Sequence, residues 1–488
     1  MPSLTVMRLG STLARARIPS NSRETTQMNQ FFSPISSRRK WLRSTACGFG
    51  SLALANLLAD QRARGDGSPT PLGPHFTPKA KRVIFVFLQG SPSQIDTFDY
   101  KPRLQNDNGK PVAAGTGNPL KYLGSPWKFS QHGQSGHWIS ELYPHVAQHA
   151  DKLCILKSLT TDIPNHPQAV LQLHTGAFRF ARPSFGSWLL YGLGTENKEL
   201  PGFLVLSPLI RVGGAQNYGN AFLPSCFQAT RIGQEGQPIA KAALGYVQNT
   251  RLDASAQRQQ LELISDLNRD RPQHSVNEGD LDGVIQSYEL AFRMQGSLPK
   301  LFDLTKETHE TLSLYGIDNP VTEDFGRQCL LARRAVESGV RFVEVTSTGW
   351  DHHSNLRRDM VKGCKAIDQP VAALLTDLER RGLLKDTLVL FGGEFGRQPI
   401  GQSADGRDHQ VDGFTMWLAG AGVRGGTTYG STDDFGQSIA TDKMHIHDLN
   451  ATLLHLLGLD HTRLTYNYSG REFRLTDVFG HVVKDILT

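Results

Sequence analysis

Short apolar runs, separated by longer amphipathic segments, constrain the fold of this chain more than any other feature. The first run, Val83–Leu88, ends before Gly90, and its continuous apolar character predicts a strand buried on both faces, as in parallel sheets. Comparable runs follow at 153–156, 203–206, 341–345, 387–391 and 414–418. Helical patterns cover residues 325–338, 355–381 and 447–457. Strands that alternate with long helices predict an α/β fold with a doubly wound, mostly parallel sheet flanked by helices.

The chain of 488 residues divides into three parts. Residues 1–59 contain an export signal, residues 60–80 are rich in Pro, Gly and Arg and predict a linker, and residues 81–488 form one large domain. Within this domain, residues 253–296 are more polar and helical, which indicates a helical insertion or a cap on the edge of the sheet.

The N-terminal part predicts export. Ser37-Arg38-Arg39-Lys40-Trp41-Leu42 resembles the twin-arginine pattern S-R-R-x-F-L, with Trp in place of Phe. The weakly apolar segment 44–59 follows, and it is shorter than the roughly 20 residues that span a bilayer. We therefore expect the twin-arginine machinery as a partner, a final location in the periplasm or outside the cell, and no stable membrane span. The alternative is a basic linker before a surface helix.

Charge is distributed unevenly along the chain. Residues 1–82 hold 13 Lys or Arg and 3 Asp or Glu, so the rest of the chain has 39 basic and 43 acidic side chains. The basic character belongs to the leader, and the domain has no basic stripe interleaved with aromatic residues. Nucleic acid is therefore excluded as an expected partner.

The cysteines beyond the leader exclude two further classes of protein. They stand far apart without a C-x-x-C pair, at Cys154, Cys226, Cys329 and Cys364. This spacing argues against a zinc ribbon and against a disulfide framework, and favours free buried thiols.

Carboxylates and imidazoles follow several predicted strands. Because the carboxyl ends of parallel strands are where ligands bind in such folds, we expect these side chains to meet at one edge of the sheet. Carboxylate and imidazole together suit Zn, Mn or Fe better than Ca. The sequence therefore predicts a site for one or two divalent ions with the candidate ligands Asp351, His353, Glu394, Asp408 and His409.

Two arginines accompany these candidates. Arg397 follows Glu394 in Gly-Glu-Phe-Gly-Arg, and Arg407 precedes Asp408 and His409. Arginine binds anionic oxygens with two parallel hydrogen bonds, so we expect Arg397 and Arg407 to bind the substrate.

Three loops leave alternatives open. After the first strand, Asp96 either faces a metal or, like Asp99, caps a helical turn. After the strand at 153–156, Thr161 is either an activated nucleophile or, with Thr160 and Asp162, a helix cap. His445 and His447 indicate the start of a helix, together with Asp448, rather than metal ligands.

These motifs resemble those of the bacterial family DUF1501. The resemblance runs in order from about Arg82 to the C-terminus and rests on these segments: Gly-Ser-Pro-Ser-Gln-Ile-Asp-Thr-Phe-Asp, Asn-His-Pro before Thr-Gly, Gly-Trp-Asp-His-His, Gly-Glu-Phe-Gly-Arg, Gly-Arg-Asp-His and Ile-His-Asp-Leu-Asn-Ala-Thr-Leu-Leu-His. The family is grouped with alkaline phosphatases, sulfatases and phosphodiesterases. The resemblance therefore implies an alkaline phosphatase-like fold and descent from two-metal hydrolases.

The metal ligands of that superfamily match this chain only in part. Asp351 and His353 look similar to the Asp-and-His pair of one metal, and His409 resembles the final His ligand. Glu394 stands where the superfamily has the Asp of an Asp-His pair, and the neighbouring His is missing. Gln89-Gly90 replaces an Asp after the first strand. The resemblance thus implies one retained metal, or a second one that uses Asp96 or Asp408.

The resemblance also implies candidates for catalysis. Pro164-Asn165-His166 resembles the Pro-Asn-His that follows the nucleophilic Thr of nucleotide pyrophosphatases. In that register Asp162 falls on the nucleophile position, with Thr161 beside it, and Asn165 matches the Asn of the motif. The Cys/Ser-x-Pro-x-Arg signature of formylglycine sulfatases is absent.

Two functions follow from the sequence. The first is an exported, metal-dependent hydrolase of phosphate or sulfate esters, acting on a small molecule or a glycan through Thr161 or a water. The second is a non-catalytic exported scaffold that binds glycans or partners in the cell envelope, which the incomplete ligand set favours.

Overall fold

The computed structural model describes residues 71–488 except 113–119, 243–250, 270–277 and 404. The predicted signal region 1–59 and the first half of the predicted linker therefore lie outside the described residues. The second half of the predicted linker packs on the domain instead of spanning a gap: the Gly73 N–H donates to Gly192 O (2.9 Å), the Lys79 N–H donates to Leu456 O (2.8 Å), and Ala80 is buried.

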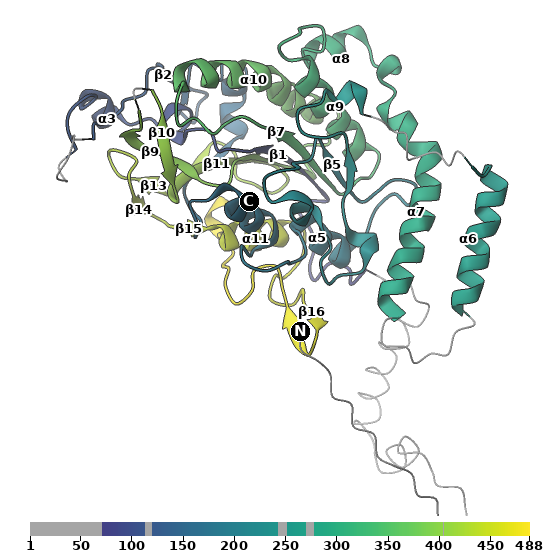
Figure 1. The fold of residues 1–488 in the computed structure, drawn as a ribbon. Helices are drawn as coiled ribbons and strands as arrows, with labels where there is room; N and C mark the ends of the chain where they lie inside the picture. Colours follow the sequence, from purple (N-terminus) through teal and green to yellow (C-terminus); the bar gives the residue numbers. More distant parts are fainter. Residues whose placement is uncertain (1–70, 113–119, 243–250, 270–277, 404) are drawn as a thin grey trace, which may run out of the picture. The chain divides into compact units, whose positions relative to one another are not determined.

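The centre of the structure is a mixed, mostly parallel sheet (Figure 1), which has nine strands among the described residues. The strand order is β12-β4-β11-β8-β1-β7-β5-β6, and β15 pairs with β4. Only β11 is antiparallel to its neighbours β4 and β8. The bounds are β1 Arg82–Leu88, β4 Cys154–Thr160, β5 Phe203–Leu206, β6 Thr230–Ile232, β7 Phe342–Ser347, β8 Thr387–Gly392, β11 Asp412–Gly420, β12 Thr427–Tyr429 and β15 Met444–His445.

All six apolar runs are strands of this sheet, which confirms the α/β fold expected from them. Strand β1 shows why a continuous apolar run suits its position. Its side chains alternate between two cores: Ile84 and Val86 pack on one face, whereas Val83 and Phe85 pack on the other.

Helices cover both faces of the sheet. Helices α9 (Glu323–Glu337) and α10 (Leu356–Arg380) contribute to the core that contains Ile84. Helices α4 (His166–Thr175), α5 (Phe185–Leu193) and α11 (Ile446–Leu456) contribute to the core that contains Phe85. The expected helices at 325–338, 355–381 and 447–457 are thus α9, α10 and α11.

Helices α6 (Ala254–Arg269) and α7 (Glu278–Phe302) occupy the segment 253–296 for which the sequence predicts helices. They pack on each other beside the sheet, beyond β5 and α9 (Figure 1). Among the described residues, no helix combines the length and the apolar character needed to cross a membrane.

Several short helices and two-stranded sheets lie outside the central sheet. The hairpin β9 (Gly396–Gly401) and β10 (Arg407–Gln410) follows β8 and carries several candidate residues. The others are α3 Pro102–Asn106, α8 His309–Leu314, β2 Phe129–His132 paired with β3 His137–Ser140, β13 Ser431–Thr432 paired with β14 Ile439–Thr441, and β16 Tyr466–Tyr468 paired with β17 Arg471–Phe473.

Candidate metal centre

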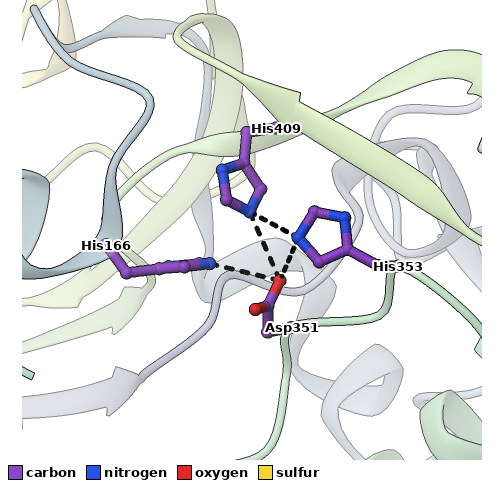
Figure 2. A group of neighbouring side chains, drawn as sticks. All are labelled: His166, Asp351, His353 and His409. Carbon is purple, nitrogen blue, oxygen red and sulfur yellow. Dashed lines mark hydrogen bonds and ion pairs between the residues drawn. The ribbon is translucent and has the colours of Figure 1, made fainter. Parts of the chain in front are cut away.

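Four side chains from three segments converge at the carboxyl edge of the sheet (Figure 2). His166 is the first residue of α4, which follows β4; Asp351 and His353 lie in the loop after β7; and His409 lies on β10, after β8. One ligand atom from each of them lies within 4.8 Å of all the others. The order of the sheet explains this meeting, because β4, β8 and β7 run in the same direction and end at the same edge.

The spacing of these atoms fits a small cation. Asp351 Oδ1 lies 3.0 Å from His353 Nε2, 3.2 Å from His166 Nε2 and 3.3 Å from His409 Nε2. The two Nε2 atoms of His353 and His409 are 2.9 Å apart. Around a tetrahedral zinc with bonds of about 2.0–2.1 Å, neighbouring ligand atoms lie roughly 3.3 Å from one another. These four distances are close to that value, and the distances from His166 to the other two histidines are within 4.8 Å, so the four side chains could hold one metal ion after a shift of His166.

Each histidine is oriented by an acceptor behind it. His166 Nδ1 bonds to Glu394 Oε1 (2.5 Å), His353 Nδ1 bonds to Gln402 Oε1 (2.5 Å), and His409 Nδ1 bonds to the carbonyl oxygen of Pro164 (2.7 Å). Because oxygens of this kind only accept, each Nδ1 carries a proton and donates it. Each Nε2 is then the atom that binds a metal, which is how metal-binding histidines are usually held.

Opposite charges within the cluster shift the pKa values of His166 and Asp351. Burial acts to lower the pKa of His166, but the carboxylates of Asp351 and Glu394 outweigh it and raise the pKa to about 9. Burial acts to raise the pKa of Asp351, but bonds from His166, His409 and Arg397 hold it well below its ordinary value. Asp351 is thus held as a carboxylate, which is the form that binds a cation.

Two predicted ligands, Glu394 and Asp408, are not among these four side chains. Glu394 is fully buried behind His166 and accepts the Gly90 N–H (3.0 Å), while its second oxygen has no partner among the described residues. Asp408 is half exposed and accepts the N–H of His409 (2.8 Å). Asp408 Oδ1 also lies 3.8 Å from His353 Nδ1, so Asp408 stands beside the group, next to the ring nitrogen that points away from Asp351.

The arginines also differ from the prediction. Arg397 is 1% exposed and donates to Asp351 Oδ1 (2.7 Å), Ser91 O (3.1 Å) and Arg407 O (3.2 Å). The guanidinium of Arg397 therefore fixes Asp351 and the loop after β1. Its burial and its internal bonds leave it unavailable to a substrate in this conformation.

Arg407 is fully buried as well. It forms a double hydrogen bond with Asp96 (2.7 and 3.1 Å) and donates to Gln398 O (3.2 Å). The prediction that Arg407 binds substrate is thus not met, and Asp96 neither faces the metal centre nor caps a helix. Asp99 is a buried partner of Lys101 (3.1 Å) and Lys157 (3.5 Å).

The residues predicted for catalysis lie in the loop before α4. The Thr161 hydroxyl is buried and donates to Gln172 Oε1 (2.9 Å), whereas the half-exposed Asp162 lies 3.3 Å from His445 Nε2. The exposed Asn165 is the N-cap of α4, so the alternative that Thr160, Thr161 or Asp162 caps this helix is wrong. The catalytic roles of Thr161, Asp162 and Asn165 remain predictions.

His445 caps α11 in a capping box with Asp448, as expected from the sequence. Sequence reasoning missed one member of the centre, His166. His166 could have been found by the same signal as the other three residues, because it follows the end of a strand. It was not chosen because Pro164-Asn165-His166 resembles a motif that follows a catalytic nucleophile.

The comparisons with known proteins give a family and distant structural likenesses. The family model described as "Protein of unknown function (DUF1501)" matches residues 80–487. No curated protein matches the chain.

Three solved structures illustrate the distant likenesses. The PsFucS1 sulfatase from Pseudoalteromonas sp. is 14% identical, with a TM-score of 0.36, over 78% of this chain and 68% of that one. The lipoteichoic acid synthase LtaP from Listeria monocytogenes is 8% identical, with a TM-score of 0.34, over 82% and 76%. The alkaline phosphatase from the Antarctic bacterium TAB5 is 13% identical, with a TM-score of 0.31, over 71% and 92%. Likenesses this distant assign no function.

Proposed function

The chain belongs to the DUF1501 family of proteins of unknown function, and on that premise we propose that it is an exported, metal-dependent hydrolase of phosphate or sulfate esters. The observation that carries the proposal is the convergence of three histidine Nε2 atoms on the carboxylate of Asp351. Three imidazoles and one carboxylate suit Zn, Mn or Fe. A divalent ion of this kind would polarise an ester oxygen and activate water.

The protein's own residues position the ligands and leave the centre accessible. Arg397 holds Asp351, while Glu394, Gln402 and the Pro164 carbonyl hold the three imidazoles. The side chains of Asp351 and His353 remain 42% and 36% exposed, so a substrate can approach from solvent.

Water is the better-supported nucleophile. The Thr161 hydroxyl is 3% exposed and bonded to Gln172, whereas the cluster faces solvent. In the proposed reaction the water oxygen bonds to phosphorus or sulfur. The bond from that atom to the alcohol oxygen breaks, and the alcohol oxygen takes up the proton that the attacking water loses.

A second candidate is the non-catalytic scaffold that binds glycans or envelope partners. Four protein donors already fill a tetrahedral zinc site, and closed sites of this kind are usually structural. The burial of Arg397 and Arg407 also favours this alternative, because neither guanidinium reaches an anionic substrate. In that case the ion would stabilise the fold, and ester hydrolysis would be absent.

The test combines metal content with turnover. We expect about one transition ion per chain by mass spectrometry, together with hydrolysis of p-nitrophenyl phosphate or p-nitrophenyl sulfate. His409→Ala and Asp351→Ala should lose both the ion and the activity, whereas His481→Ala, at an exposed histidine, should keep both. Activity retained in a metal-free His409→Ala protein would refute the hydrolase, and a bound ion without turnover would favour the scaffold.

A further inference from the structure

An exposed surface of aromatic and arginine side chains lies where the loop 177–182 meets the β16–β17 hairpin. Figure 1 shows this hairpin projecting from the body of the domain near α5 and α11. We call it the aromatic–arginine surface, and its members are Phe180, Arg182, Phe222, Tyr466, Tyr468 and Phe473.

The rings of this surface are ordered around one guanidinium. The Arg182 guanidinium carbon lies 4.4 Å from the centre of the Phe473 ring and 5.5 Å from that of Phe180. The Phe222 ring stacks on Tyr468, with centres 5.1 Å apart and planes 18° apart. Phe180 is 64% exposed and Tyr468 is 49% exposed. Large rings that remain exposed in an ordered cluster are typical of a binding surface.

The hairpin holds these rings in place. Tyr468 pairs with Arg471 across a two-residue turn in which Ser469 has φ 51° and Gly470 has φ 82°. Both values lie in the left-handed region that a tight hairpin turn of type I′ requires. The tight turn fixes the register of β16 and β17, so a ligand would meet pre-positioned rings.

The two arginines of this surface differ in their carboxylate partners. Arg182 has no carboxylate within ion-pair distance among the described residues, whereas Arg471 pairs with Asp477 (2.6 Å). Burial and the neighbouring Arg471 lower the pKa of Arg182, and the nearby carboxylate of Asp477 opposes them only in part. Arg179, on the same loop, is exposed. An anion bound here would relieve the repulsion between the cations.

We propose that the aromatic–arginine surface binds an anionic polysaccharide, whose sugar rings stack on Phe180 and Tyr468 and whose acidic groups pair with Arg182. The apolar face of a sugar ring matches an aromatic ring, and a carboxylate or sulfate matches the guanidinium. Single-stranded nucleic acid also combines stacking with charge, but it needs a basic groove that follows its backbone. The guanidiniums over the Phe473 ring are those of Arg182 and Arg471, and Arg471 is paired with Asp477, so these two side chains do not form such a groove.

The surface is connected to the metal centre through α4, which begins at His166 and ends at Thr175, just before the loop. Ten helical residues span about 15 Å, so a polymer rather than a single sugar would reach from one place to the other. The proposed binding does not depend on the proposed hydrolase, because it requires no metal and no turnover.

Native gel electrophoresis in gels that contain chondroitin sulfate tests the proposal. We expect the wild-type protein to be retarded by this polymer and not by neutral dextran. The dissociation constant should rise at least tenfold in the double variant Phe180→Ala/Tyr468→Ala and in Arg182→Gln. Arg182→Lys keeps the positive charge, so its dissociation constant should rise less than that of Arg182→Gln. The matched controls Leu263→Ala and Lys365→Gln, at an exposed apolar side chain and an exposed cation elsewhere, should bind as the wild type does.

Three outcomes would overturn the proposal: no retardation, retardation that these variants leave unchanged, or equal binding of dextran or single-stranded DNA. Thermal melting of each variant shows whether it is folded. The single variant Phe180→Ala is a second test, because this exposed ring makes few contacts that stabilise the fold. His409→Ala should still bind the polymer, so a failure of the metal centre and a failure of this surface are distinguishable.

Discussion

At the scale of single residues, the candidate metal centre depends on the groups behind its four side chains. Glu394 is the charged one among the three acceptors that orient the histidines, and it is completely buried. Its negative charge both fixes the ring of His166 and makes the Nε2 atom a stronger donor to a cation. Arg397 plays the corresponding part for Asp351, because it fixes the carboxylate without reaching solvent.

Replacing Glu394 tests this role directly. Glu394→Gln keeps the shape of the side chain but removes its charge, so we expect metal affinity to fall by about 10–100-fold. Competition with a chelator of known affinity measures the change. Glu379→Gln, at an exposed carboxylate on α10, is the control and should leave the affinity unaltered. If the metal affinity of Glu394→Gln is unaltered, the charge of Glu394 does not contribute to metal binding through His166.

At the scale of elements, α4 connects the metal centre to the rest of the domain. It begins at His166 with a proline in its first turn and ends at Gly176, which has φ 71°. A side chain at this glycine would meet the carbonyl oxygen of Leu475 at 2.0 Å, so the end of the helix is fixed by a close backbone contact. The position of His166 therefore depends on packing at the far end of its helix.

Gly176→Ala should destabilise the protein by at least about 1–2 kcal/mol, because it adds both left-handed strain and a clash. Gly296→Ala is the matched comparison: it lies inside α7, and its new methyl group would contact nothing within 4 Å. That variant should be neutral or more stable by about 0.5–1 kcal/mol. Denaturant unfolding measures both, and equal effects would refute the argument.

Helices α9 and α10 are joined through a cluster of ion pairs. Glu307 bonds to Arg333 (2.8 Å) and to Arg334 (2.6 Å), and Arg333 also pairs with Asp377 of α10 (2.9 Å). Burial acts to raise the pKa of Glu307, but the two arginines outweigh it and lower the pKa below its ordinary value. A carboxylate with a lowered pKa stabilises the folded state above its unfolded pKa, and this contribution is lost as the pH falls through the folded value.

The consequence is a stability difference that depends on pH. At pH 7, Glu307→Gln should be less stable than the wild type by on the order of 2 kcal/mol, since hydrogen bonds to charged groups are lost. The difference should shrink as the pH is lowered through about 4 and below. Thermal melting of both proteins at pH 7 and pH 3.5 measures it. Glu199→Gln, at an exposed carboxylate, controls for general effects of acid, and a constant difference would contradict the assignment.

At the scale of the whole molecule, the sheet places the candidate side chains at one edge. Strands β4, β8 and β7 are separated by β11 and β1, yet all three deliver candidate residues to the same edge because they run in the same direction. This placement is the general expectation for open α/β sheets.

Export concerns the whole chain as well, and it remains our proposal from the residues of the leader. Replacing Arg38 and Arg39 by lysine should leave the protein inside the cytoplasm, since the twin-arginine pair is the recognised feature. Cell fractionation with an antibody against the protein measures its location. A Lys40→Arg variant is the control and should be exported, whereas export of the double-lysine variant would point to another route.

The positions of the strands and the main helices were predictable because they depend on local patterns. Phe203–Leu206 is a strand with the predicted bounds, and the other five runs differ by a few residues at their ends. An apolar run is buried wherever it folds, so its neighbours in the sequence suffice to identify it. The same local reasoning found Asp351, His353 and His409, because each stands after a recognisable strand.

The amino-acid sequence by itself thus determined the layered α/β architecture and the family, and it predicted three of the four side chains that converge in the candidate metal centre. Only the tertiary structure decided that His166 is the fourth member, that Glu394 supports it from behind, and that Arg397 and Arg407 are buried. The reason is distance along the chain: His166 and Glu394 are 228 positions apart, and Arg407 and Asp96 are 311 positions apart. A contact between residues so far apart in the chain cannot be predicted from the periodicity of a short segment. Which side chains meet is therefore fixed by the order and direction of the strands that carry them.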